Sequence, residues 1–171
     1  MQSPADALME AVRAHETVIP LVVFALAFGE SLAVVSVFLP ATALLAGGAG
    51  ISSAAGMNFW TLWLVATAGA AAGDWVSYVL GFRFGPAIAG AWPLSRRPDL
   101  LIRGRVFFER WGIASVFLGR FFGPLRCIIP LIAGICAMPF IPFQMSNILS
   151  AALWAAVVLA PGHLAVMWFV S

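Results

Sequence analysis

Charged residues are scarce in this sequence of 171 residues, which contains no lysine and only seven acidic residues. Charged residues make up 9% of the chain and hydrophobic residues 63%, and the mean hydropathy is +1.02. A soluble domain carries about 25% charged residues, because its surface needs a polar covering. The deficit excludes a soluble globular domain, and we predict that lipid surrounds most of the protein.

Two long stretches, residues 31–73 and 127–171, contain no charged residue at all. Each stretch is about twice the ~20 residues that one helix needs to cross ~30 Å of hydrocarbon. The alternation of β-barrel strands is absent, and backbone polar groups must be paired in lipid, so these elements are predicted to be helices. The predicted fold class is therefore all-α, in a polytopic integral membrane protein.

Residue patterns that would indicate an enzyme, a metal site or nucleic acid are also lacking. The two cysteines, Cys127 and Cys136, lie in an apolar stretch and are predicted to be packing residues. There is no metal-binding cluster, no nucleophile–base constellation and no glycine-rich nucleotide loop, so we expect no cofactor and no catalysis. Basic residues interleaved with aromatic ones are absent, so nucleic acid is not an expected partner. Residues 1–16 contain four charges and are not expected to be a cleavable signal.

We predict a single membrane domain over residues 1–171, divided into six segments. These are an interfacial amphipathic helix (4–16), a first interrupted membrane unit (17–57), a transmembrane helix (58–82), an arginine-rich cytoplasmic loop (83–110), a second interrupted unit (111–138) and a C-terminal membrane helix (143–170). Six of the nine arginines lie in the loop, which the positive-inside rule places in the cytoplasm. Two interpretations of these arginines stay open, a topology signal and direct binding of anionic lipid headgroups. The apolar run after residue 160 is short enough to be a separate half-helix.

The two interrupted units share a spacing. Gly29-Glu30 is followed after nine residues by Pro40, and Gly119-Arg120 is followed after nine residues by Pro130. One spanning helix between the units would make them enter the membrane from opposite sides. This pattern predicts two opposed re-entrant (broken-helix) hairpins in an inverted repeat, with a substrate site near the midplane. The residues assigned to the hairpins are Pro40, Pro124, Pro130 and Gly134, because proline interrupts a helix and glycine permits close packing.

Four ionisable residues fall inside apolar segments, where a charge costs several kcal/mol unless it is paired or lines a wet cavity. They are Glu30, Asp74, Arg120 and Arg126. One hypothesis is that two acids and two arginines simply pair and fix the helix register. The other is a polar cavity in which the arginines bind an anion such as phosphate, and the acids orient them or carry protons.

Three stretches carry a resemblance to a known family: GESLAVVSVFLPATALLAGG at 29–48, GDWVSYVLGFRFG at 73–85 and FFERWGIASVFLGRFFGPLRCIIPLIAGICAMPFIPF at 107–143. The sequence resembles the DedA family, which carries the VTT domain. The family's Phe/Tyr-x-x-x-Arg motif falls on Phe122 and Arg126. Its Gly-x-x-x-aliphatic-x-x-x-x-Phe motif falls on Gly134, Met138 and Phe143. The resemblance covers about residues 20–160.

The resemblance implies two facing re-entrant hairpins in a protein of the bacterial cytoplasmic (inner) membrane. It implies lipid transport, of undecaprenyl phosphate or of phospholipid, with the essential residues at Glu30, Arg120 and Arg126. The sequence departs from the family where Thr42 stands in place of a frequent acid, which argues against proton coupling unless Asp74 substitutes. Typical members continue with a further apolar C-terminal helix after the stretch that resembles PGHLAVMW; we expect either that another subunit of a homo-oligomer supplies it or that the function does not need it.

The favoured function is therefore a membrane lipid transporter or flippase that moves an anionic headgroup across the bilayer. A proton- or ion-coupled transporter for a small anion would use the same arginines, and vesicle transport of a soluble anion without lipid movement would indicate it. A structural membrane-homeostasis protein would use the four charges only for stability. An enzyme is the least expected class.

Overall fold

The computed structural model describes residues 18–32, 41–54, 57–90, 98–121, 126 and 128–170, and every element within these ranges is a helix. The helices are α2 (Val18–Ser31), α3 (Ala41–Ala54), α4 (Phe59–Gly90), α5 (Pro98–Trp111), α6 (Ile113–Gly119), α7 (Ile128–Ile135) and α8 (Phe140–Val170). The all-α fold class is thus confirmed for the described residues. The predicted amphipathic helix at 4–16 and the prolines Pro40 and Pro124 lie outside them.

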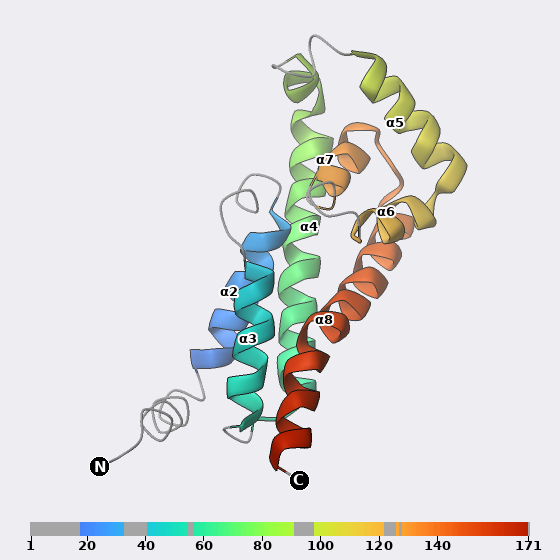
Figure 1. Ribbon diagram of the computed structural model, residues 1–171. Coiled ribbons are helices and arrows are strands. Elements are labelled where there is room, and N and C mark those ends of the chain that lie inside the picture. The colour runs from blue at the N-terminus through green and yellow to red at the C-terminus, as the bar shows by residue number, and fades with distance from the viewer. Residues whose placement is uncertain are drawn as a thin grey trace.

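Helix α4 packs against α2 along its first half, against α7 along its second half and against α8, whereas α3 packs on α8 and α2 (Figure 1). Glycines on α4 permit the approach of α2. A Cβ atom on Gly69 would lie 2.5 Å from the carbonyl oxygen of Phe24, and one on Gly73 would lie 2.5 Å from that of Phe28. Small residues four positions apart allow such close contact between membrane helices.

The second half of α4 receives α7 in the same way. A Cβ atom on Gly81 would collide with the carbonyl oxygen of Leu131, and one on Gly85 would lie 3.4 Å from the Cα of Ile135. Gly134 of α7 faces α4 in turn, where a Cβ atom would collide with the carbonyl oxygen of Tyr78. The two glycine pairs of α4 therefore position α2 and α7 on either side of its midpoint.

Two apolar clusters form the core. The first apolar cluster joins α2, α3, the first half of α4 and the middle of α8: Ala27, Leu45, Ala49, Leu62, Ala66, Ala70, Ala151, Trp154, Ala155, Val158 and Leu159. The second apolar cluster joins the second half of α4 to α5, α6, α7 and the start of α8: Tyr78, Phe108, Val116, Ala133, Met138 and Phe143. Buried polar residues of α4 and α8 lie between the two clusters.

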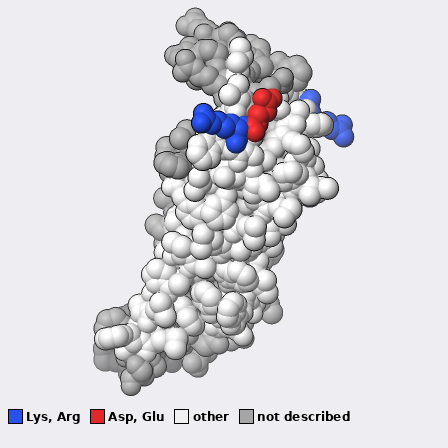
Figure 2. Space-filling view, turned by 90° about the vertical axis from the view of Figure 1, so that its right-hand side faces the viewer, with Lys and Arg blue, Asp and Glu red and all other residues white. Residues whose placement is uncertain are grey.

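The outer surface of the described residues is too apolar to be stable in contact with water. Large hydrophobic side chains such as Ile141, Val157 and Trp168 are exposed along the whole of α8. Figure 2 shows charged side chains gathered in one band of the visible face, and the described surface below the band carries none. Extended apolar surface of this kind indicates contact with lipid. By length and composition, one of the described helices, over Phe140–Trp168, is able to cross a membrane.

The structure corrects the end of one predicted helix, because α4 does not end at residue 82 but continues to Gly90. Within the arginine-rich segment, residues 98–111 form α5, where the sequence of 98–110 also permits an amphipathic helix. Contact of Gly85 with α7 supports the extension of α4 beyond the charge of Arg83. The C-terminal membrane helix predicted over 143–170 lies within α8, which continues through Pro161, so the alternative of a separate half-helix after residue 160 is wrong.

Close packing explains why α8 tolerates this proline. A Cβ atom on Gly162 would lie 2.7 Å from the carbonyl oxygen of Ala46 and 2.8 Å from the backbone nitrogen of Gly50. Helix α3 therefore approaches α8 at the turn that the proline weakens. In membrane proteins, neighbouring helices commonly support a helix at such a position.

Candidate functional site

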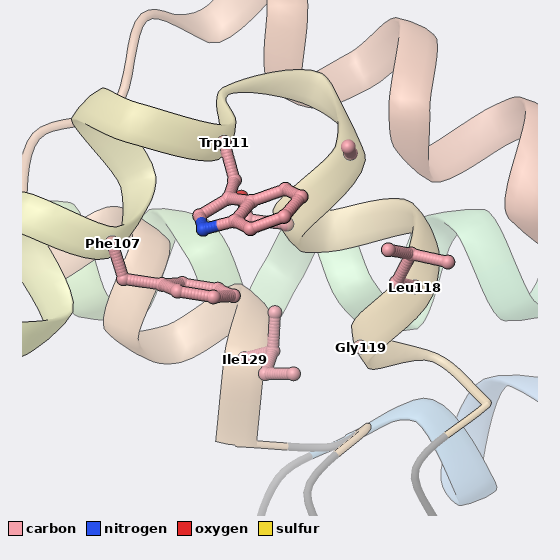
Figure 3. A pocket seen from close by; sticks show the side chains of 7 residues that line it. Phe107, Trp111, Leu118, Gly119 and Ile129 are labelled. Atoms are coloured by element: carbon pink, nitrogen blue, oxygen red, sulfur yellow. The ribbon is translucent and has the colours of Figure 1, made fainter.

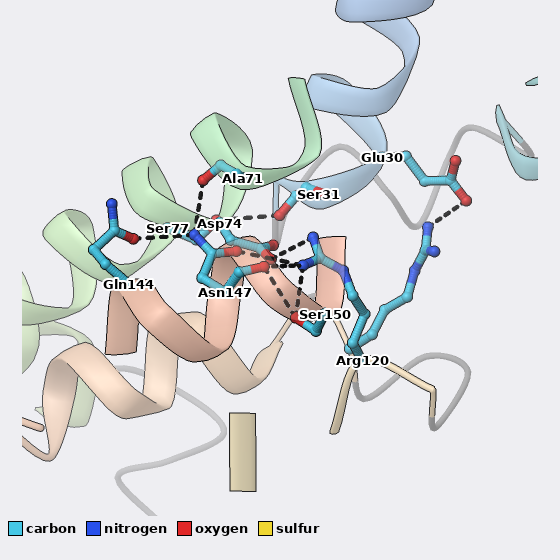
Figure 4. Close-up of polar contacts among 10 residues, drawn as sticks. Glu30, Ser31, Ala71, Asp74, Ser77, Arg120, Gln144, Asn147 and Ser150 are labelled. Atoms are coloured by element: carbon cyan, nitrogen blue, oxygen red, sulfur yellow. Dashed lines mark hydrogen bonds and ion pairs between the residues drawn. The ribbon is translucent and has the colours of Figure 1, made fainter. Parts of the chain in front are cut away.

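The four predicted intramembrane charges meet in one place, between the two apolar clusters. We call Glu30, Asp74, Arg120 and Arg126 the ionic layer. Glu30 lies at the end of α2, Asp74 half-way along α4, Arg120 directly after α6, and Arg126 two residues before α7. Glu30, Asp74 and Arg120 are 4%, 5% and 7% exposed, respectively. The four residues form two acid–arginine pairs, as the pairing hypothesis predicts (Figure 4).

Arg120 is anchored at several points. Its Nη2 lies 2.6 Å from Asp74 Oδ2 in a buried ion pair. Its Nη1 donates to Ser150 Oγ at 3.0 Å and to the carbonyl oxygen and side-chain oxygen of Asn147 at 3.1 and 3.3 Å (Figure 4). A buried guanidinium with this many acceptors is compensated electrostatically and held in one orientation. These contacts connect the end of α6 to α4 and α8.

Asn147 connects α8 to α4 independently of Arg120. Its Nδ2 donates to the carbonyl oxygen of Ala71 at 2.9 Å and to Gln144 Oε1 at 3.1 Å. Ser150 Oγ donates to the carbonyl oxygen of Asn147 at 3.0 Å. Asn147 and Ser150 are fully buried. Because lipid offers no hydrogen bonds, such polar contacts help to set the register of the helices.

The second pair, Glu30 with Arg126, has a different environment. Glu30 Oε1 accepts the ion pair from Arg126 Nη2 and a hydrogen bond from the hydroxyl of Thr42 at the start of α3. The guanidinium carbon of Arg126 lies 5.3 Å from the centroid of the Trp154 ring of α8. This distance is within the range of a cation–π contact. The side chain of Arg126 is 16% exposed, compared with 6% for Arg120.

The two arginines are therefore suited to different tasks. Within the described part of the chain, Arg126 has one carboxylate partner and one ring, whereas Arg120 has four acceptor atoms on three residues. Exchange of Glu30 for another anion would leave the contact of Arg126 with Trp154 in place. Exchange of Asp74 for another anion at Arg120 would disturb a network of contacts that spans three helices.

Two helix N-termini lie at the ionic layer. Thr42 is the second residue of α3, and Arg126 comes two residues before α7. The amide groups at a helix N-terminus carry partial positive charge and favour anions. These two N-termini add partial positive charge to a layer in which two carboxylates balance two arginines.

The hairpin residues and the second family motif have structural roles around Tyr78. Pro130 lies in the first turn of α7, a position where proline is tolerated because its missing amide has no helical acceptor. Gly134 packs against the backbone of Tyr78. Tyr78 Oη donates to the carbonyl oxygen of Met138 at 2.6 Å, and its ring stacks on Phe143 with centroids 4.3 Å apart. Gly134, Met138 and Phe143 thus all contact one residue of α4.

The sequence-based prediction missed the uncharged partners of the layer. Thr42 was noted only for the acid that it replaces, and Asn147, Ser150 and Trp154 were not assigned to the site. Their spacing carried a signal, because positions 147, 150 and 154 share one helix face. Phe122 of the first family motif lies outside the described residues.

The contribution of Thr42 is testable by replacing it with valine, which keeps the shape and removes the hydroxyl. We expect Thr42→Val to destabilise the protein by about 1.5–3 kcal/mol, because a hydrogen bond to a charged group is lost. Thr42→Ser, which keeps the hydroxyl, is expected to lose less than half as much. Thermal unfolding in detergent measures both variants, and a loss in Thr42→Ser as large as that in Thr42→Val would show that the hydroxyl does not dominate the contribution of Thr42.

Comparison with known proteins places the ionic layer inside a known domain. The chain matches the VTT domain over residues 19–164. It is 34% identical over 161 residues to the inner membrane protein YabI of Escherichia coli, covering 94% of this chain and 63% of YabI. It is 31% identical over 148 residues to the inner membrane protein YghB of E. coli, covering 86% of this chain and 68% of YghB.

An uncharacterized membrane protein of Buchnera aphidicola is 32% identical over 142 residues, covering 83% of this chain and 56% of that protein. The chain therefore spans less than two thirds of the length of YabI and of the Buchnera protein. No solved structure matches it.

Proposed function

Because the chain belongs to the VTT domain (DedA) family of membrane proteins, we propose that it is a transporter that moves the headgroup of an anionic lipid across the bilayer. It is a bacterial inner membrane protein, as its relatives are. The headgroup is the phosphate of undecaprenyl phosphate or of a phospholipid, and the hydrocarbon chains stay in the membrane. In this proposal the protein catalyses no chemical reaction.

The observation that carries the proposal is the asymmetry of the two ion pairs. Arg126 is the more exposed arginine and lies between Glu30 and the ring of Trp154. A guanidinium group binds phosphate oxygens with parallel hydrogen bonds, as it binds a carboxylate. A lipid phosphate can therefore replace Glu30 at Arg126 without creating an unpaired cation. Glu30 keeps the hydroxyl of Thr42 as a donor during the exchange.

In the same proposal Arg120 is a positioning residue. Its contacts with Asp74, Asn147 and Ser150 hold the end of α6, and the segment that leads to Arg126 starts there. The N-termini of α3 and α7 add positive potential along the path of the headgroup. The layer would then provide a polar crossing point for a phosphate that pure hydrocarbon excludes.

We also propose that the two pairs of short helices are opposed re-entrant hairpins. Helices α2 and α3 have 14 residues each and are about 21 Å long at 1.5 Å per residue, less than the ~30 Å of the hydrocarbon core. The α2–α3 pair ends at the ionic layer beside the first half of α4, and the α6–α7 pair ends there beside its second half (Figure 1). The arginine-rich segment after α4 would face the cytoplasm.

The test is transport in proteoliposomes, with labelled phosphatidylglycerol and undecaprenyl phosphate followed separately. We expect Arg126→Gln to slow lipid movement by about tenfold or more, because charge-assisted hydrogen bonds contribute about 1.5–3 kcal/mol each. The control is Arg83→Gln, which removes an exposed arginine outside the ionic layer and is expected to leave the rate unchanged.

Three outcomes would count against lipid transport by Arg126. Equal rates for wild type and Arg126→Gln would remove Arg126 from the mechanism. Movement of inorganic phosphate without lipid would favour a small-anion transporter that uses the same arginine. No movement of either solute by folded wild-type protein would favour a structural role for the ionic layer.

A further inference from the structure

An apolar groove lies between α5, α6 and α7, outside the ionic layer. It has a volume of about 430 Å³ and is lined by Phe107, Trp111, Ala114, Ser115, Leu118, Gly119 and Ile129 (Figure 3). This volume is within the range of about 300–1,000 Å³ of small-molecule sites. The side chains of Phe107, Trp111 and Ile129 surround the groove in Figure 3.

The groove has almost no hydrogen-bonding capacity. Ser115 is the one lining residue with a hydroxyl, and this hydroxyl donates to the carbonyl oxygen of Gly112 at 2.5 Å. The indole of Trp111 belongs to a residue that is 50% exposed. A polar solute would therefore lose its hydrogen bonds to water without replacement, whereas hydrocarbon would lose none.

The membrane itself supplies the occupant. Leu118 and Phe107 at the rim are 49% and 45% exposed, on a surface that faces lipid. A groove left empty would lose dispersion contacts along its walls, and the hydrocarbon of a surrounding bilayer could supply them. Because bilayer hydrocarbon is as apolar as leucine, the groove alone does not select one lipid. Selection requires a contact with the headgroup.

The groove ends beside the ionic layer. Gly119 lines the groove and directly precedes Arg120, and Ile129 lines it in the first turn of α7, three residues after Arg126. The absence of a side chain at Gly119 lets Ile129 approach, because a Cβ atom there would collide with the end of the Ile129 side chain. At its other side the groove borders Trp111, next to the exposed Arg110.

From this continuity we propose that the groove holds one acyl chain of an anionic phospholipid whose phosphate is bound in the ionic layer. The inference rests on the proposed function for the role of the phosphate. Arg110 at the end of α5 would attract the same headgroup as it enters, since it is a cation beside an interfacial tryptophan. The groove then keeps the lipid attached to the protein while its headgroup crosses.

Photo-crosslinking tests the groove directly. The probe is phosphatidylglycerol with a diazirine in one acyl chain, reconstituted with the full-length protein and mapped by peptide mass spectrometry. We expect labelling to concentrate on residues 107–129 and to exceed labelling of the lipid-facing side chains Leu153 and Val157 of α8. Even labelling of both regions would overturn the proposal.

Two variants that fill the groove sharpen the test. Ala114→Phe adds a ring inside the groove, and Leu118→Trp adds one at its exposed rim, where folding is less affected. Each is expected to lower labelling of 107–129 by about tenfold, because the ring occupies the volume of the chain. The matched control is Ile113→Phe, an exposed position on the same helix outside the groove. Unchanged labelling in Leu118→Trp, or an equal loss in Ile113→Phe, would overturn the groove as the binding site.

Transport measured on the same vesicles separates the two proposals. Labelling confined to the groove with no lipid transport by wild-type protein supports the acyl-chain site and removes the transport function. If wild-type protein transports lipid, Arg126→Gln abolishes the transport and labelling is not enriched at the groove, the result supports the proposed function and rejects the acyl-chain site.

Discussion

Replacing Asp74 with asparagine is expected to lower the melting temperature of the detergent-solubilised protein by about 10 °C. The substitution leaves Arg120 charged and buried without its carboxylate, and breaking a buried pair costs about 3–5 kcal/mol. Arg120 is 7% exposed and cannot turn to water without leaving α4 and α8. Thermal unfolding followed by fluorescence or size-exclusion chromatography measures the loss.

The control for this result is the double variant Asp74→Asn with Arg120→Gln. Removing both charges leaves no buried ion without its partner, so the double variant is expected to recover more than half of the stability that Asp74→Asn loses. The interaction energy from the double-mutant cycle reports the coupling of the two side chains. Additive losses would show that Asp74 and Arg120 act independently, contrary to the 2.6 Å ion pair.

Replacing Gly134 with alanine is expected to lower stability by about 2 kcal/mol, although alanine favours helix by about 1 kcal/mol over glycine. The added Cβ would collide with the carbonyl oxygen of Tyr78 and lie 2.7 Å from the backbone nitrogen of Phe82. Both are backbone atoms of α4 and cannot move as a side chain does, so α7 must shift. The shift would also strain the hydrogen bond from Tyr78 to Met138.

Gly47→Ala is the matched control, because it makes the same change inside α3. A Cβ atom on Gly47 would have no neighbour within 4 Å. We expect Gly47→Ala to leave the melting temperature unchanged or to raise it, since only helix propensity acts there. If Gly47→Ala lowered the melting temperature as much as Gly134→Ala does, close packing of α7 on α4 would not be the cause of the destabilisation.

The sequence alone was sufficient to predict that lipid surrounds the protein, that the fold is all-α and which charged residues form the ionic layer. Charge-free stretches and high hydropathy predicted helices in lipid, because the cost of an unpaired charge or backbone group in hydrocarbon depends on composition and not on fold. For the same reason Glu30, Asp74, Arg120 and Arg126 were identifiable as exceptions, and the structure brings them into two pairs.

The uncharged partners were harder to predict because their role depends on contacts between helices. By residue type, nothing distinguishes Asn147 and Ser150 from other polar residues, whereas in the fold both accept hydrogen bonds from Arg120, which follows α6. In the sequence Thr42 was notable only because it stands where the family frequently has an acid, whereas in the fold its hydroxyl donates to Glu30. Helix ends were equally dependent on contacts, as the continuation of α4 beside α7 and of α8 beside α3 shows.

The composition and spacing of the chain thus determined that it lies in a membrane, that it is helical and which four charges need partners. Only the tertiary structure decided how those charges pair. Asp74 lies between Ala70 and Tyr78 on one face of α4, where α6 and α8 bring Arg120 and its acceptors to one side. Pairing is a property of helix packing, and packing here depends on glycines whose effect appears only when a second backbone approaches them.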